Sequence, residues 1–479
     1  MDEYIEDVKN TAEKDESVVE NKSFANPQEN EPVTVDSSVS EDEVVAGEPA
    51  PVFGDEPVQK EEPTPVKKLE DEDVLEHTAS LWNYFPVPTD QVEPVPEYIT
   101  LTKTFPGSKI TAARVRGKKH KHEGTNCDDW FEVSNYDDIT FIVVSDGAGS
   151  KKFSRIGARE SCRAAAGYLA ANFKEAISND ASIRENLKLE VTDAKFTASC
   201  SLLAEILQKA SLQAFNAVEA AFYSRSTNEE YSKLLGRDLR FNDLSGTLLV
   251  VALIPTDISK KEHVVITCQV GDGLIALIDS KGGYNDSLKI MGDPDSGDFS
   301  GETEFLTSSK NRDLDSYKRK TKVTKDTLDT VLVMSDGVAD DYFPADPQIR
   351  RLYYDLIVNG IIPSESAVKS LDSFSSEDMR LFKQIPSPVA YPWVNDKSIK
   401  VPLQYTKKIC EKINLSLEDI WSDRTVLDLA AIELKNMADL SDPSERLKVW
   451  LDNYVERGSF DDRTLVIATV DGDSDGTNC

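Results

Sequence analysis

The sequence predicts an α+β fold in which antiparallel sheets carry their helices on the outer faces. Strand-like segments come in runs along the chain, and helix-like segments also come in runs. Strands and helices do not alternate as they would in a βαβ wind with a parallel sheet. The 479 residues are enough for two domains, or for one large domain with tails.

The first elements follow from the spacing of apolar residues. Strands are expected at 98–105 and 109–117, where apolar and polar residues alternate, and at 137–145, where the centre is apolar throughout. Helices are expected at 154–177 and about 196–224, because Ala and Leu recur there at spacings of three and four.

Strands return in the second half of the chain, followed by a long helical stretch and one last strand. Further strands are expected at 246–254, 262–270, 274–280, 329–335 and 463–470. Residues 345–458, between the last two of these strands, have a mainly helical pattern. We therefore expect one domain over 97–473, with a helical insertion around 345–458.

Residues 1–96 are predicted to be an acidic, disordered tail. The first 80 residues hold 24 Asp and Glu against 6 Lys and Arg, and their prolines interrupt any strand or helix period. Such a segment buries too little apolar surface to offset its chain entropy. Two interpretations stay open, a regulatory or docking tail and a tail that only solvates the protein.

The overall composition restricts the partners and the location. The net charge of −32 repels phosphate backbones, so nucleic acid is not an expected partner. No apolar run has the length of a membrane span, and no secretory signal is evident. The six cysteines are scattered without a C-x-x-C pair. We expect a soluble protein of the reducing cytoplasm.

Aspartates stand at the ends of several predicted strands. Two apolar runs end in Ser-Asp-Gly, at Asp146 and Asp336, and each leads into a helical pattern rather than into the second strand of a hairpin. Paired aspartates precede two other strands, at 128–129 and 461–462. If these carboxylates converge, cations or protonation must relieve their repulsion. Hard oxygen ligands favour Mg²⁺ or Mn²⁺, and two such ions activate a water for attack on phosphorus.

Six short motifs in this order resemble the metal-dependent Ser/Thr phosphatases of the protein phosphatase 2C type, in a bacterial-type branch. They are GKKHKHEGTNCDDW, FIVVSDGAGS, LSGTLLVVALI, QVGDGLIAL, VLVMSDGVAD and FDDRTLVIA. The resemblance covers roughly residues 105–470. It implies a four-layer α-β-β-α sandwich of two antiparallel sheets with outer helices.

The resemblance also implies a set of metal-binding residues. They are Asp128, Asp129, Asp146, Gly147, Asp272, Asp336 and Asp461. Asp146 would bridge two ions, Gly147 would offer its carbonyl, and Asp128 and Asp129 would act mostly through water. Asp272 matches the position that binds a third ion in bacterial relatives, although a plain hairpin turn there is the alternative.

Two positions depart from the better-known members of that family. Gly124 stands where they carry an arginine that grips the substrate phosphate, and Ala148 stands where they carry a histidine that is a candidate general acid. His120 is therefore the first candidate for either task, with His122, Arg114 and Arg116 behind it. The alternative for His120 is a solvated histidine in a basic loop.

The predicted function is hydrolysis of phosphoserine and phosphothreonine in proteins by a metal-activated water. The catalytic residues would be His120, Asp129 and Asp146, with two Mn²⁺ or Mg²⁺ ions and a third as an option. The predicted partners are a phosphorylated protein and a cognate Ser/Thr kinase, with a role in signalling. The alternatives are an inactive pseudophosphatase that binds phosphoproteins and a two-metal nuclease, which the acidic composition disfavours.

Overall fold

The computed structural model describes the chain from residue 83 onward, with gaps. The described ranges are 83–88, 91–292, 303–363, 374–384, 405–435, 442–453 and 460–470. All of them belong to one compact unit, Lys67–Cys479. The predicted disorder of residues 1–82 lies outside the described residues.

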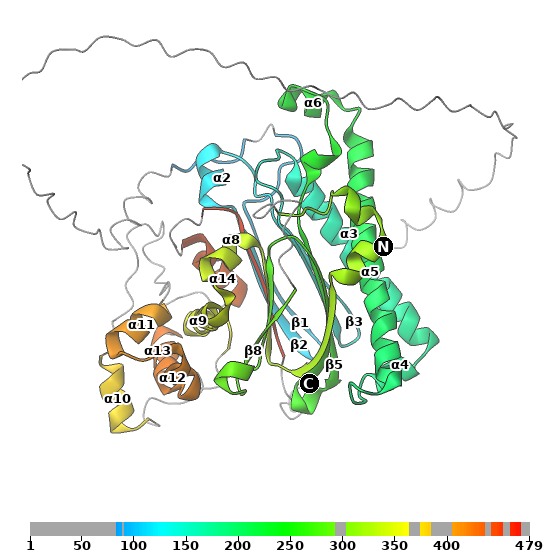
Figure 1. The fold of residues 1–479 in the computed structure, drawn as a ribbon. Helices are drawn as coiled ribbons and strands as arrows, with labels where there is room; N and C mark the ends of the chain where they lie inside the picture. The colour runs from blue at the N-terminus through cyan, green and yellow to red at the C-terminus, as the bar shows by residue number, and fades with distance from the viewer. Residues whose placement is uncertain are drawn as a thin grey trace, which may run out of the picture. The chain divides into compact units, whose positions relative to one another are not determined.

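The described residues form two antiparallel sheets (Figure 1). The first sheet has the strand order β1-β2-β11-β10-β7-β8. Its strands are β1 Tyr98–Phe105, β2 Ser108–Val115, β7 Leu274–Ile278, β8 Leu288–Met291, β10 Thr330–Met334 and β11 Arg463–Thr469. The second sheet has the order β3-β4-β5-β6-β9. Its strands are β3 Trp130–Tyr136, β4 Ile139–Ser145, β5 Leu248–Asp257, β6 Glu262–Val270 and β9 Thr321–Thr327.

Helices lie on the outer face of each sheet, and the ends of the strands carry short helices. Those on the five-stranded sheet or beside it are α3 Ser154–Asn179, α4 Ser182–Asn186, α5 Ala194–Arg225, α6 Glu229–Leu235 and α7 Leu314–Arg319. The others are α2 Lys118–Glu123, α8 Asp336–Ala339, α9 Ala345–Val358, α10 Ser376–Phe382, α11 Tyr405–Ile413, α12 Leu417–Ser422, α13 Thr425–Lys435 and α14 Pro443–Asn453. Among the described residues, no helix combines the length and the apolarity that a membrane crossing requires.

Alternate side chains of the central strands fill separate cores. In β5, Val250 and Ala252 pack with helices α3 and α5, while Leu249 and Val251 pack between the sheets. In β10, β11 and β2 the alternation divides residues between the inter-sheet core and the core under α9 and α14. A strand buried on both faces needs apolar residues at every position, which is why these strands appear in the sequence as continuous apolar runs. The four-layer α-β-β-α sandwich is confirmed.

The end of the predicted tail packs on this sandwich. We call residues 83–88 and 91–97 the N-terminal strap. The amide of Phe85 donates to the carbonyl of Lys121 in α2 at 2.8 Å, and the amide of Val95 donates to Asn126 Oδ1 at 3.0 Å. The ordered chain therefore starts before residue 97, the boundary expected from composition. Pro and Val are the commonest residues of the strap, as in parts of the tail, so its sequence resembles the tail even though its backbone is hydrogen-bonded.

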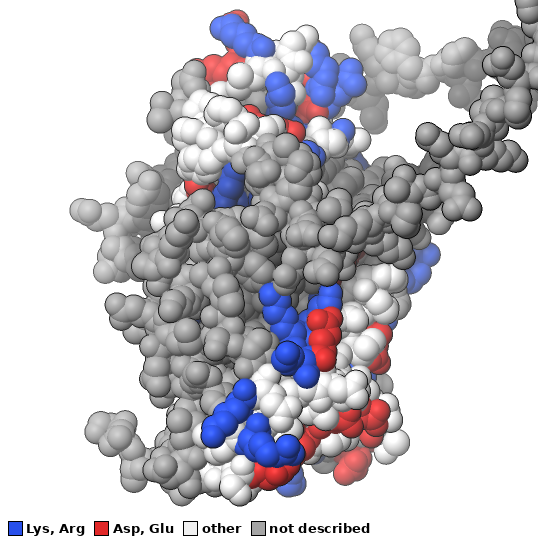
Figure 2. All heavy atoms as spheres, turned by 90° about the vertical axis from the view of Figure 1, so that its left-hand side faces the viewer, with Lys and Arg blue, Asp and Glu red and all other residues white. Residues whose placement is uncertain are grey.

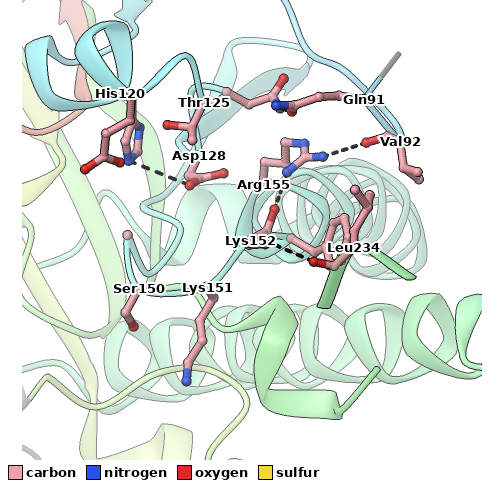
Figure 3. Close-up of a pocket in the computed structure, with 14 residues that line it drawn as sticks. Gln91, Val92, His120, Thr125, Asp128, Ser150, Lys151, Lys152, Arg155 and Leu234 are labelled. Atoms are coloured by element: carbon pink, nitrogen blue, oxygen red, sulfur yellow. Dashed lines mark hydrogen bonds and ion pairs between the residues drawn. The ribbon is translucent and has the colours of Figure 1, made fainter. Parts of the chain in front are cut away.

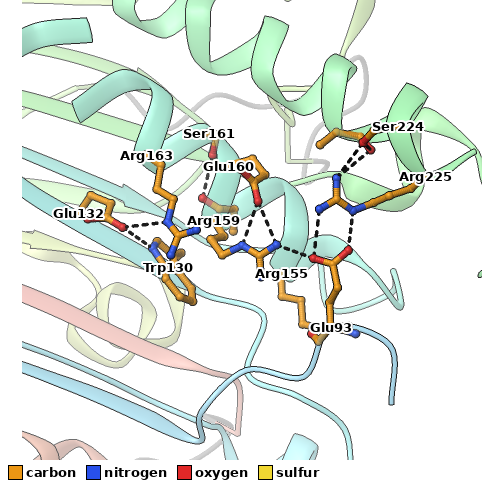
Figure 4. Close-up of polar contacts among 12 residues, drawn as sticks. Glu93, Trp130, Glu132, Arg155, Arg159, Glu160, Ser161, Arg163, Ser224 and Arg225 are labelled. Carbon is orange, nitrogen blue, oxygen red and sulfur yellow. Dashed lines mark hydrogen bonds and ion pairs between the residues drawn. The ribbon is translucent and has the colours of Figure 1, made fainter. Parts of the chain in front are cut away.

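The strap is also fixed by a partly buried ion-pair network (Figure 4). Glu93 accepts hydrogen bonds from Arg159 in α3 at 2.5 Å, from Arg225 in α5 at 2.5 Å and from the hydroxyl of Tyr231 in α6. Burial opposes the charge of Glu93, but its hydrogen bonds to Arg225, Tyr231 and Arg159 lower its pKa to about 2. One carboxylate thus ties three helices to the strap.

Charges of both signs cover the described surface on the side of α10–α13. Figure 2 shows Lys and Arg side chains lying next to Asp and Glu there. By sequence, the first 80 residues account for −18 of the net −32, and the other 399 residues carry the remaining −14.

Candidate metal centre

Three aspartates from both sheets meet at one edge of the sandwich. Asp146 follows the last residue of β4, Asp272 lies in the turn between β6 and β7, and Asp336 begins α8 directly after β10. One carboxylate oxygen from each lies within 4.8 Å of the other two. A turn between β6 and β7 was the alternative expectation for Asp272. The turn is present, and it places Asp272 in this cluster.

Asp129 is buried beside this cluster and is held by hydroxyl groups. Its Oδ2 accepts hydrogen bonds from Ser335 Oγ at 2.9 Å and from Thr464 Oγ1 at 2.6 Å. Its other oxygen, and one oxygen of Asp272, are buried without a hydrogen-bond donor among the described residues. Buried carboxylate oxygens that lack donors are suited to a cation.

The ionisation of the cluster gives a second sign that it fits divalent ions. Burial, and then the charges of Asp336 and Asp129, raise the pKa of Asp146 well above its ordinary range. Burial, and then the charge of Asp272, raise the pKa of Asp336 to about 8. Burial, and then Asp462, raise the pKa of Asp129 to about 6. Without cations these groups would be partly protonated at neutral pH, and divalent ions would relieve the repulsion.

Gly147 allows this edge to pack closely. It forms an isolated bridge with Gly246, and a Cβ atom placed on it would lie 2.5 Å from the carbonyl oxygen of Asp128. A larger residue would therefore push Asp128 away from Asp146. The carbonyl of Gly147 stays a predicted ligand.

Asp461 lies at the side of the three-aspartate cluster. Its charge is among the smaller causes, after burial and nearer carboxylates, that raise the pKa values of Asp146 and Asp336. Its ligand atoms come within 4.8 Å of those of His120 and Asp462, a second group of the kind that holds metals. The structure thus gathers the predicted residues into two adjacent groups.

Asp462 organises the second group, and the sequence analysis gave it no role. Its Oδ1 accepts from the amide of Gly117 at 2.6 Å. Its Oδ2 is hydrogen-bonded to His120 Nδ1 at 2.8 Å and to the amide of Asp128 at 2.5 Å. A buried carboxylate with three partners anchors α2 and the 128–129 pair to the start of β11.

His120 is a buried, ion-paired side chain, so its interpretation as a solvated histidine was wrong. Burial alone would lower its pKa, but the charge and hydrogen bond of Asp462 raise the pKa to about 9. Its Nε2 lies 3.9 Å from Asp128 Oδ2. Burial, and then Asp462, raise the pKa of Asp128 to about 7.

The other candidates for holding phosphate are occupied elsewhere. Arg114 is fully buried and donates to the carbonyl of Asp129 at 2.7 Å, and Arg116 donates to the carbonyl of Phe85 at 2.6 Å. His122 accepts from the amide of Asn83 at 3.1 Å. These three residues hold the strap and the strand end together, and Arg114 and Arg116 are buried.

Lys119 is a cation near the centre that the sequence analysis missed. A Cβ atom placed on Gly149 would lie 3.9 Å from Lys119 Nζ and 3.9 Å from both carboxylate oxygens of Asp461. Gly124, at the position of the missing arginine, ends α2 with φ of +71°, a conformation that disfavours arginine. Lys119 lies one turn earlier in the same helix, which no motif indicated.

Comparisons with solved structures give similar chains of low identity. RsbX in complex with magnesium is 12% identical, covering 78% of this chain and 100% of that one, with a TM-score of 0.28. Stp1 from Staphylococcus aureus is 12% identical, covering 81% and 100%, with a TM-score of 0.30. The serine/threonine phosphatase of S. agalactiae is 11% identical, covering 78% and 99%, with a TM-score of 0.31. No curated protein sequence matches the chain.

The family assignment rests on a sequence model rather than on these low scores. The model described as protein phosphatase 2C matches residues 116–361, which is more than half of the chain. The match includes β4 with Asp146, the turn with Asp272 and the start of α8 with Asp336. The chain therefore belongs to the protein phosphatase 2C family of metal-dependent phosphoprotein phosphatases.

Proposed function

We propose that this chain hydrolyses phosphoserine and phosphothreonine in proteins with two Mn²⁺ or Mg²⁺ ions. The observation that carries the proposal is the meeting of Asp146, Asp272 and Asp336, with oxygens inside 4.8 Å and raised pKa values of Asp146 and Asp336. The residues that would hold the ions are Asp146, Gly147, Asp336 and Asp461. Asp128 and Asp129 act through water, and Asp272 is available for a third ion.

When bound, such ions favour deprotonation of a water and offset the charge of the phosphoryl group. The chain's own residues orient the reaction. Hydroxyl groups of Ser335 and Thr464 fix Asp129, and Asp462 keeps His120 protonated at neutral pH. A protonated His120 is the form that donates a proton to the departing serine or threonine oxygen. Lys119 takes the role of the missing arginine by holding the phosphate.

The test is hydrolysis of p-nitrophenyl phosphate and of a phosphoserine peptide by the full chain, with Mn²⁺ and with chelator. Asp146→Asn and Asp336→Asn should each abolish turnover and weaken Mn²⁺ binding measured by calorimetry. Asp238→Asn, which neutralises an exposed carboxylate, is the control and should change neither. Full turnover by either cluster variant would contradict the proposal.

The second candidate is a pseudophosphatase that binds phosphoproteins without turning them over. Gly124 and Ala148 favour it, because neither offers a side chain for phosphate or for the leaving group. It predicts phosphopeptide binding without Mn²⁺-dependent release of phosphate. A measurable kcat that falls when Lys119 or His120 is replaced would favour the phosphatase over the pseudophosphatase.

The remaining predictions concern the cell. A phosphoprotein is the expected substrate, and a cognate Ser/Thr kinase, a signalling role and a cytoplasmic location remain predictions from the sequence. Co-purification of a kinase with the full chain would support the prediction of a kinase partner.

A further inference from the structure

A cavity of about 310 Å³ opens next to the candidate metal centre (Figure 3). Asp128 and Gly149 line it, and Gly149 is also the residue that faces Asp461 and Lys119. The other walls come from separate elements. They include Val92 of the strap, Phe153 and Arg155 at the start of α3, and Leu234 of α6. A protein substrate with its phosphate at the metals would lie across this opening.

Positive charge dominates the lining. Lys151, Lys152 and Arg155 line the cavity, against Glu123 and Asp128. Arg155 donates to the carbonyls of Val92 at 2.6 Å and Glu93 at 3.0 Å. Lys152 Nζ donates to the carbonyl of Leu234 at 3.1 Å. These partners are neutral oxygens, so the hydrogen bonds position both cations, although the carboxylates of Asp128 and Glu93 offset part of the charge of Arg155.

The walls are held together before any substrate arrives. Glu93 binds Arg159 of α3, Arg225 of α5 and Tyr231 of α6 (Figure 4). The strap, α3 and α6 are the elements that supply Val92, Arg155 and Leu234 to the cavity. A preformed cavity loses less entropy on binding than one that must close around its ligand.

We propose that this cavity selects substrates by accepting an acidic side chain close to the phosphorylated residue. The proposal rests on the proposed function, since the phosphate must first lie at the metals. An extended chain advances about 3.3 Å per residue, so a side chain within two residues of the phosphoserine reaches the cavity. A Lys or Arg there would meet three like charges, whereas Glu or Asp would meet opposite ones.

The experiment uses the full chain with Mn²⁺ and a phosphoserine peptide series. Each of the two positions on either side of the phosphoserine carries Glu, Ala or Lys in turn. At the position whose side chain reaches the cavity, a peptide with Glu should have a kcat/KM about tenfold above that of the peptide with Lys. The difference should lie chiefly in KM. The double variant Lys151→Glu with Lys152→Glu should reverse this order. Lys174→Glu makes the same type of charge change in α3, about 30 Å along the helix, and should leave the order unchanged.

Kinetics and binding together separate the two proposals. Equal kcat/KM for all peptides within twofold, with good turnover, would overturn the cavity proposal and leave the phosphatase function intact. Fluorescence polarisation of the same labelled peptides with Mn²⁺, read at once after mixing, gives affinities before turnover consumes the peptide. If the peptides with Glu bind more tightly but no peptide is hydrolysed, the cavity proposal is supported and the proposed phosphatase function is contradicted.

Discussion

Among single residues, Asp462 has a structural role that the sequence motif does not indicate. The sequence places Asp461 and Asp462 side by side before the last strand, and only Asp461 was predicted to act. The structure gives Asp462 three partners, and their effect lowers its pKa although burial alone would raise it. Its role depends on Gly117, His120 and Asp128, more than 330 residues away in the chain. A local pattern does not contain that information.

Replacing Lys119 tests the proposed phosphate contact. Lys119→Met keeps the length of the side chain and removes the charge next to Gly149, so kcat/KM for a phosphoserine peptide should fall about 10²-fold. Mn²⁺ affinity, measured by calorimetry, should stay within a factor of about two. Lys121→Met serves as the control. It removes another lysine of α2, one that pairs with Asp452 of α14. Unchanged kinetics in Lys119→Met would assign the phosphate contact to another residue.

Among the elements, burial decides which strands the sequence predicts. Strands β4, β5, β6, β10 and β11 are buried on both faces, and their apolar runs predicted them. Strand β9 was missed because its residues Thr321–Thr327 are polar and half-exposed at a sheet edge. The strap was missed because hydrogen bonds and one ion-pair network hold it, and neither leaves a period in the sequence.

The strap network predicts a pH dependence of stability. The pKa of Glu93 is about 2 in the folded protein against an ordinary value of 4.5, so its charge stabilises the fold above pH 4.5. This contribution is lost as the pH falls from about 4.5 to about 2. Glu93→Gln should lower the free energy of unfolding in urea at pH 7 and flatten its decline over that acid range. Glu175→Gln, at an exposed position of α3, should leave both unchanged.

In the whole molecule, the metal centre exists only because two sheets pack face to face. Asp146 and Asp272 follow strands of one sheet, and Asp336 follows a strand of the other. The order of the motifs predicted the set, but only the packing shows that Asp461, beside the three-aspartate cluster, also lies close to His120 and Asp462. The cavity walls had no sequence signal, since they come from the strap, α3 and α6.

Repulsion among the clustered carboxylates predicts that metal stabilises the entire fold. Mn²⁺ at about 100 times its Kd should add about 2.7 kcal/mol and raise Tm by about 3–4 °C. Chelator should reverse the shift in a calorimetric scan. Asp146→Asn should raise the Tm of the metal-free chain, because it removes a charge from the cluster, and should lose most of the gain on adding Mn²⁺. An equal gain in wild type and variant would place the ions elsewhere.

The strap fixes where the first 82 residues are attached. Asn83 contacts His122, and the neighbouring Glu123 lines the cavity, so the acidic stretch is covalently joined at the rim of a basic opening. Salt should therefore weaken the binding of any acidic peptide at this opening, because it screens the attraction between the peptide and the lysines of the lining.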